Sequence, residues 1–194
     1  VAPDRLKWIA VIPFRSPGEA VEEVQRVKQL GAVGAMTLGT AGDTMLHDLQ
    51  FDPIFRELVR QDLPVCIHVG WGHRGLQESA DGMFASFGVS FTLPVLMGFF
   101  SIVGGGVLDR HPDLRAGFFE AGGDWLPWMV QRMNRYRGVT MFHNVTPVSK
   151  HPIEEYLKAG NVYFTIEGDE WLVPQVIELL GEDHVMASAD IPHP

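Results

Sequence analysis

The sequence predicts an α/β protein of the (β/α)8 TIM-barrel type, incomplete in this chain, with about six of the eight strand–helix units. Short apolar segments of strand length alternate with longer segments whose apolar residues recur at helical spacing. Such alternation favours a parallel sheet, and eight units close a barrel of about 250 residues. The chain has 194 residues and starts at Val1 rather than Met. We therefore expect residues 1–194 to form a single barrel domain that lacks its first strands and its C-terminal end.

Six segments have the composition of buried parallel strands. They are short, apolar and bounded by turn-forming residues. They cover residues 8–14, 33–38, 65–69, 114–120, 162–166 and 185–190. Six strands alone would leave two open sheet edges, and exposed edges promote aggregation. This is a second reason to expect further strands.

Four segments between these strands have helical spacing of their apolar residues, namely residues 17–30, 54–61, 125–136 and 172–180. In the first helix, Ser16 is a candidate N-cap and Pro17 takes the first helical position. Residues 70–88 are predicted to form a long loop, and loops of this length are often functional. Residues 91–108 are apolar and are expected to form a buried helix, because a membrane span needs about 20 residues.

A doubly wound parallel sheet is the alternative fold. Nucleotide-binding proteins of that class carry Gly-x-Gly-x-x-Gly after a strand. No such motif follows any predicted strand of this sequence. The barrel is therefore the preferred prediction.

Composition excludes several classes of protein. The net charge of −9 argues against nucleic acid as a partner, because no basic stripe is present to neutralise phosphates. The one cysteine, Cys66, excludes a disulfide framework and favours a reducing, cytoplasmic compartment. We expect no membrane partner. We expect the substrate to be a small molecule.

Three polar residues end predicted strands, where barrel enzymes place their catalytic groups. They are His68, Glu120 and Asp190. Because strand side chains alternate, Glu120 should share a face with Phe118, as His68 does with Cys66. If that face is the inward one, the three side chains converge at the barrel mouth.

The residue types suit a metal site. A neutral imidazole and a carboxylate are good ligands for zinc or manganese. The metal would lower the pKa of a bound water or polarise a carbonyl, and a second carboxylate would move the proton. Catalytic zinc usually has three protein ligands, so a further strand would have to complete the set.

Five motifs follow one another along the chain. They are Phe-Asp-Pro at 51–53, Leu-Pro-Val-Cys-Ile-His-Val-Gly at 63–70, Val-Leu-Asp-Arg-His-Pro-Asp-Leu-Arg at 107–115, Glu-Ala-Gly-Gly-Asp-Trp-Leu-Pro at 120–127 and Ser-Ala-Asp-Ile-Pro-His at 188–193. In residues and order they resemble the amidohydrolase-related family, whose best-known members are of the aminocarboxymuconate-semialdehyde decarboxylase type. The resemblance covers nearly the whole chain.

The resemblance implies a distorted TIM barrel that binds one divalent metal, zinc first and manganese as the alternative. Its ligands would be His68, Asp190 and a His-x-His pair of the first strand, which this sequence does not contain. The family often has a catalytic His where this chain has Glu120, and this departure leaves the reaction type open. The family commonly forms dimers, so a homodimer is a further expectation.

Four residues are candidates for substrate contact. Two lie in the segment predicted as a loop, one begins a helix, and one follows Asp190. They are Trp71, His73, Trp125 and His193. Glu167 and Asp169 end the fifth predicted strand and are second-rank candidates for the same mouth.

Three functional hypotheses follow. The first is a metal-dependent hydrolase of a small organic substrate, in which the metal activates water, Asp190 binds metal and accepts a proton, and Glu120 assists as acid or base. The alternative is non-oxidative, metal-dependent decarboxylation of an aromatic or enoic acid, with an acid that protonates the carbon losing CO₂. A third hypothesis is a non-catalytic barrel that binds a small molecule or a partner subunit.

Overall fold

A computed structural model describes residues 2, 4–139, 141, 143 and 146–189. Its main feature is a six-stranded, fully parallel sheet with the strand order β1-β2-β5-β6-β7-β8. The strands are β1 Ile9–Val11, β2 Gly34–Leu38, β5 Val65–His68, β6 Ala116–Phe119, β7 Val162–Ile166 and β8 Val185–Ala187. All six predicted strands are confirmed. Their order in space follows the chain, as a barrel requires.

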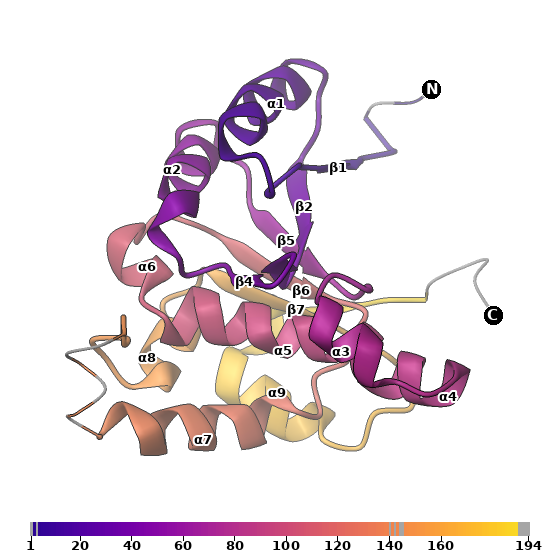
Figure 1. The fold of residues 1–194 in the computed structure, drawn as a ribbon, viewed down its shortest axis with the longest axis vertical. Coiled ribbons are helices and arrows are strands. Elements are labelled where there is room, and N and C mark those ends of the chain that lie inside the picture. Colours follow the sequence, from indigo (N-terminus) through magenta and orange to yellow (C-terminus); the bar gives the residue numbers. More distant parts are fainter. Residues whose placement is uncertain (1, 3, 140, 142, 144–145, 190–194) are drawn as a thin grey trace.

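Helices pack along one side of this sheet (Figure 1). The longer ones are α1 Pro17–Gln29, α2 Asp52–Arg60, α5 Leu93–Phe99, α7 Leu126–Arg137 and α9 Val173–Leu180. Strand residues on the helix side, such as Val65, Ile67 and Phe118, are buried. On the opposite side, Val11 is 67% exposed. The apolar core therefore lies between sheet and helices.

The core is densest where four rings meet. Phe99 of α5, Phe118 of β6 and Phe164 of β7 lie within 6 Å of one another by ring centroids, and Trp125 packs on two of them. Aromatic pairs at such distances and tilts are favourable beyond the apolar area they bury. This cluster fixes α5 and the start of α7 against the strands that carry the candidate site.

The predicted loop over residues 70–88 is wrong. The segment contains α3 Arg74–Ser79 and α4 Met83–Ala85, and α4 continues through π-helical turns at Ser86–Phe91 and Phe100–Gly104. Its glycines and serines are weak helix formers. Tertiary packing stabilises these helical turns despite the low helix propensity, because the rings of Trp71, Phe87 and Phe91 contact one another.

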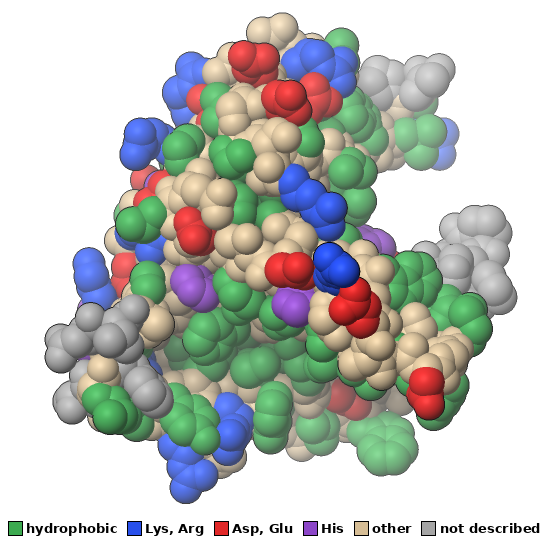
Figure 2. Space-filling view, in the orientation of Figure 1, with side chains coloured by type: hydrophobic (Ala, Val, Ile, Leu, Met, Phe, Trp, Pro, Cys, Tyr) green, Lys and Arg blue, Asp and Glu red, His purple; other side chains and the backbone are tan. Residues whose placement is uncertain are grey.

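The resulting helix runs from Met83 to Arg110, 28 residues, and is longer than predicted. By length and composition alone it could cross a membrane, but 67% of its most apolar window is buried inside the fold. That burial is the environment of a core helix. On the face shown in Figure 2, charged side chains gather over α1. Met83 and Phe84 of α4 are exposed apolar residues.

A short hairpin and a short helix were not predicted. A two-stranded antiparallel hairpin, β3 Thr40–Ala41 with β4 Thr44–Met45, follows β2. The helix α8 Ile153–Lys158 precedes β7, and α6 Val107–Arg110 is the last turn of the long helix before β6. Elements of two to six residues carry too little periodicity to be recognised in a sequence.

Candidate active site at the carboxyl end of the sheet

His68 and Glu120 meet at the carboxyl end of neighbouring strands. The Nε2 atom of His68 lies 2.8 Å from Oε2 of Glu120, and the two side chains are 34% and 22% exposed. A pair that is partly buried but still open to solvent can reach both a substrate and a proton source. The predicted convergence of these two residues is confirmed.

The predicted cause of that convergence, the alternation of side chains along the strand, is wrong. His68 pairs in register with Phe119, so Phe119 shares its face, and an extended Glu120 would point to the helix side with Phe118. Instead, Glu120 follows the end of β6 in the left-handed region, at φ +63°. This conformation turns the carboxylate back toward His68. It is uncommon for a residue other than glycine and costs about 1–3 kcal/mol.

Thr165 of β7 holds Glu120 in this conformation. Its Oγ1 accepts a hydrogen bond of 2.9 Å from the backbone N–H of Glu120. The same hydroxyl donates to the carbonyl oxygen of Phe118 at 3.4 Å. Thr165 is 8% exposed, so little water competes for these bonds. One buried hydroxyl thus connects the strand end and the strained residue beyond it.

Two carboxylates join the loop that follows β6 to the loop that follows β7. Glu170 accepts hydrogen bonds from the backbone N–H groups of Gly123 and Asp124. Asp124 in return accepts from the backbone N–H groups of Trp171 and Leu172, at 3.0 and 2.7 Å. Neither residue was predicted from the sequence to belong to the site. Their partners lie 46 to 48 positions away, so no local pattern could have revealed them.

The orientation of His68 favours a metal ligand. Its Nδ1 lies 3.0 Å from the carbonyl oxygen of Val69, which can only accept, so Nδ1 carries a proton. In the neutral ring Nε2 then has a bare lone pair and would repel the carboxylate of Glu120. The 2.8 Å separation is a hydrogen-bond distance and is too short for a metal ion on the line between the two atoms, because each metal–ligand bond would be about 2.0–2.2 Å. Backbone carbonyls hold metal-binding histidines in this way.

Within the described residues, however, no group of three or more His, Cys, Asp and Glu side chains could hold a metal. His68 and Glu120 supply two donors. Asp190, the other predicted ligand, and His193, a predicted substrate contact, lie outside the described residues. The residues that are described therefore fit one part of a metal site.

The three other described candidates for substrate contact make hydrogen bonds within the protein. The indole N–H of Trp71 donates to Ser86 Oγ at 2.7 Å, and the ring is 44% exposed. His73 caps α3, where its Nδ1 accepts from the backbone N–H of Leu76. Trp125 donates to the carbonyl oxygen of Ala121 and packs in the aromatic cluster. Substrate contact by these three residues stays a prediction.

Cys66 is not a nucleophile. Burial raises the pKa of its thiol to about 12, so the reactive thiolate does not form near neutral pH. It shares a face of β5 with His68 and fills space beneath it.

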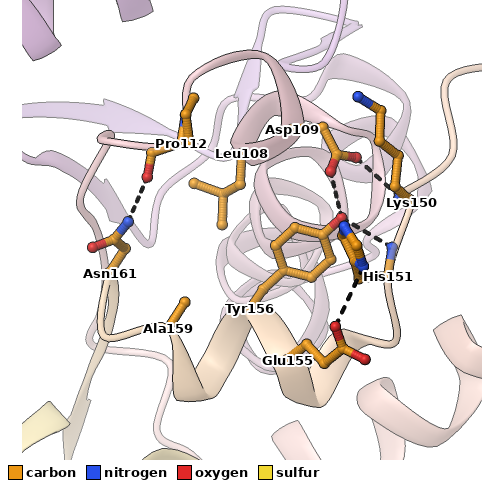
Figure 3. Close-up of a pocket in the computed structure, with 9 residues that line it drawn as sticks. All are labelled: Leu108, Asp109, Pro112, Lys150, His151, Glu155, Tyr156, Ala159 and Asn161. Atoms are coloured by element: carbon orange, nitrogen blue, oxygen red, sulfur yellow. Dashed lines mark hydrogen bonds and ion pairs between the residues drawn. The ribbon is translucent and has the colours of Figure 1, made fainter.

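A cavity of about 370 Å³ opens at the other end of the strands (Figure 3). Several polar groups that line this cavity are already hydrogen-bonded to other groups of the protein. The hydroxyl of Tyr156 donates to Asp109 Oδ1 at 2.6 Å, and the other oxygen of Asp109 accepts from the backbone N–H of Lys150. Asn161 donates to the carbonyl oxygen of Pro112. These groups stabilise the base of the sheet and lie away from His68, so we do not assign the chemistry to this cavity.

The chain matches a known protein family and is similar to characterised relatives. The family model described as amidohydrolase matches residues 1–194. Gamma-resorcylate decarboxylase of Rhizobium sp. (strain MTP-10005) is 27% identical over 202 residues, which cover 98% of this chain and 61% of that protein. The gamma-resorcylate decarboxylase of Rhizobium radiobacter is 26% identical over the same shares. The chain thus spans about 61% of the length of these relatives.

Solved structures give the same result for the fold. The 5-carboxyvanillate decarboxylase of Sphingomonas paucimobilis superposes with a TM-score of 0.85 at 23% identity, over 98% of this chain and 58% of that chain. The enzyme of the same name from Novosphingobium aromaticivorans has a TM-score of 0.81 at 26% identity, over 98% and 55%. That crystal structure contains manganese and 4-hydroxy-3-methoxy-5-nitrobenzoic acid. The predicted barrel-type α/β fold is confirmed.

Proposed function

Since the chain belongs to the amidohydrolase family, we propose that the protein is a metal-dependent, non-oxidative decarboxylase of hydroxylated aromatic acids. The observation that carries the proposal is the His68–Glu120 pair, 2.8 Å apart at the carboxyl end of β5 and β6. The relatives that resemble the chain over 98% of its length are named as decarboxylases of such acids. Of the two enzymatic hypotheses, decarboxylation therefore has more support than hydrolysis.

His68, through Nε2, and Asp190 are the residues of this chain that would hold one divalent metal. Manganese comes first, because it is the metal in the Novosphingobium aromaticivorans structure, and zinc is the alternative. When bound, the metal would supply positive charge that orients the oxygens of the substrate. The carbonyl of Val69 keeps the ring of His68 turned so that Nε2 faces the mouth.

Glu120 supplies the proton. In its protonated form it donates to the ring carbon that bears the leaving carboxylate, so that a C–H bond forms. The C–C bond then breaks, its electron pair restores the aromatic ring, and CO₂ leaves. Thr165 binds the backbone N–H of Glu120 and in this way holds the residue that carries the carboxyl group. A positioned acid of this kind contributes about 10²–10⁴-fold in rate.

Hydrolysis uses the same residues differently. Glu120 would then remove a proton from an attacking water, and oxygen from water would enter the product. Decarboxylation leaves the oxygen content of the remaining product unchanged apart from the lost CO₂ and places a solvent hydrogen on carbon. The two reactions therefore differ in an isotope experiment.

We would incubate the full-length protein with manganese and 2,6-dihydroxybenzoate in D₂O. Decarboxylation predicts CO₂ release and one deuterium on the ring carbon that carried the carboxylate, detected by mass spectrometry and NMR. A parallel incubation with aryl esters and lactones in H₂¹⁸O tests hydrolysis. Incorporation of ¹⁸O without CO₂ release would overturn the proposal in favour of a hydrolase, and no turnover in either case would favour a binding protein.

A further inference from the structure

The loop that carries Glu120 is held from two directions. Where the loop leaves β6, Thr165 accepts a hydrogen bond from the backbone N–H of Glu120. Further along the loop, one carboxylate oxygen of Glu170, Oε2, accepts from the backbone N–H groups of both Gly123 and Asp124. Thr165 belongs to β7, and Glu170 lies in the loop that follows that strand. The backbone on both sides of Glu120 is therefore tied to β7 and its loop.

Glu170 is itself held by its own loop. Its second oxygen, Oε1, accepts from the backbone N–H of Glu167 at 2.6 Å, while Oε2 reaches across to the loop of Glu120. Hydrogen bonds to an ionised carboxylate are shorter and stronger than those between neutral groups. The side chain thus has a fixed position, and it passes that position on to a loop 47 residues away in the chain.

The turn after Glu120 is shaped to admit this carboxylate. Gly122 has φ +62°, in the same left-handed region as Glu120 at +63°. A Cβ atom on Gly122 would be 3.0 Å from Cδ of Glu170, so the carboxylate group occupies the space that a side chain would need. Glycine adopts a left-handed conformation without strain, whereas glutamate does not. The strained residue therefore depends on contacts that hold the neighbouring backbone.

These contacts lie inside the described sheet. The strand β6 pairs with β5 and β7, and β7 pairs with β6 and β8, so both strands have neighbours on either side. Asp124 reinforces the connection in the opposite direction, because it accepts from the backbone N–H groups of Trp171 and Leu172. The two loops consequently form one hydrogen-bonded unit behind the His68–Glu120 pair.

We propose that Glu170 is a positioning residue for the acid Glu120. Its carboxylate holds the turn at Gly122 and Gly123, and this keeps Glu120 left-handed with Oε2 2.8 Å from Nε2 of His68. Glu170 acts through the backbone and takes no part in the transfer of the proton. The inference rests on the proposed function, because it assumes that Glu120 delivers that proton.

Hydrogen exchange of single amides tests the positioning without turnover. In the full-length manganese form of Glu170→Ala, the amides of Gly123 and Asp124 should exchange faster because they lose their acceptor. The amide of Glu120 donates to Thr165 instead, so its exchange reports the transmitted effect and should rise about 10-fold or more. Asp109→Ala, which removes a loop-binding carboxylate at the amino end, is the control. Equal exchange of the Glu120 amide in both variants would overturn the proposal.

Kinetics separates positioning from a general loss of stability. Glu170→Ala should lower kcat for 2,6-dihydroxybenzoate about 10-fold or more and leave KM within about 2-fold and the metal content unchanged, because a misplaced acid weakens only the transition state. Glu170→Gln keeps one acceptor oxygen and should recover part of both the rate and the protection of Glu120. It also serves as the test variant if Glu170→Ala is too unstable to measure.

Two outcomes distinguish the failures. A lowered Tm in both Glu170 variants, with kcat and the exchange of the Glu120 amide unchanged, would overturn the positioning role. If the unaltered protein releases no CO₂ in the isotope experiment but the exchange result is as expected, the proposed function fails and Glu170 still positions Glu120.

Discussion

The two ends of one sheet differ in the polar contacts that the structure describes there. At the amino end, Tyr156 and Asp109 bond each other and the nearby backbone, so their cavity has little left to offer a ligand. At the carboxyl end, Glu120 is held in a left-handed conformation and Thr40 keeps a hydroxyl without a described partner. A left-handed residue and unpartnered polar atoms also occur near the amino end, at Asp62, Ser149 and His184, so what distinguishes the carboxyl end is that its left-handed residue faces His68. We therefore expect the amino end to contribute to stability and the carboxyl end to carry the chemistry.

The substitution His68→Asn should have the largest effect and tests whether activity depends on the carboxyl end of the sheet. We expect metal content to fall far below one per chain and kcat/KM to fall at least ~10³-fold, because the charge that a metal supplies contributes several kcal/mol. Metal analysis and steady-state kinetics measure the two effects. His151→Asn, at the amino end, is the matched control and should keep both metal and activity. Similar losses in the two variants would remove the distinction between the ends.

Glu120→Gln should have the next largest effect. The amide keeps the size of the side chain but cannot donate the proton, so kcat should fall about 10²–10³-fold while metal is retained. Rapid-quench kinetics and Tm are the measurements. Glu178→Gln, on the exposed side of α9, controls for loss of one charge. Full activity of Glu120→Gln would reduce the residue to a structural partner of His68.

Thr165→Val tests whether the strained conformation depends on its clamp. Without the hydroxyl, Glu120 loses its backbone bond, and kcat should fall about 10-fold or more, as when an outer partner of a site is removed. The pH dependence of kcat should also change, because the carboxyl group no longer keeps one position beside His68. Thr165→Ser should restore both the rate and the pH profile. A lowered Tm with an unchanged pH profile would indicate a purely structural hydroxyl.

Tyr156→Phe should leave activity within about 2-fold and act on stability. It leaves Asp109 without one buried donor, so the free energy of unfolding should fall by about 1–3 kcal/mol. Denaturant titration measures the change. An effect on kcat larger than the effect of Thr165→Val would contradict the separation of the two ends.

The same tyrosine gives an expected pH dependence. Burial, followed by its bond to Asp109, raises the pKa of Tyr156 from 10.0 to about 12. A pKa that is higher in the folded than in the unfolded protein contributes stability that is full below pH 10 and is lost as the pH rises through 12. Between these values the unaltered protein should lose more stability than Tyr156→Phe. Parallel unfolding curves over that range would show that the hydroxyl is solvated.

The strands that carry the site were predictable because parallel strands have apolar runs with sharp boundaries, as in residues 65–69 and 162–166. His68 and Glu120 were predictable because they end such runs. The helices between Arg74 and Phe91 were not, since contacts of Trp71 with Phe87 and Phe91 stabilise a segment of weak helix formers.

The sequence by itself determined the fold class, the order of the strands and the residue types at their carboxyl ends, because these depend on local periodicity and on motifs along the chain. Only the tertiary structure decided how Glu120 reaches His68, which hydroxyl holds it, and which buried hydroxyl is left without a partner. Those features depend on contacts between residues far apart in the chain, such as the 45 positions that separate Glu120 from Thr165. A left-handed φ and an unpartnered hydroxyl are properties of the packed chain, and no local pattern of residues encodes them.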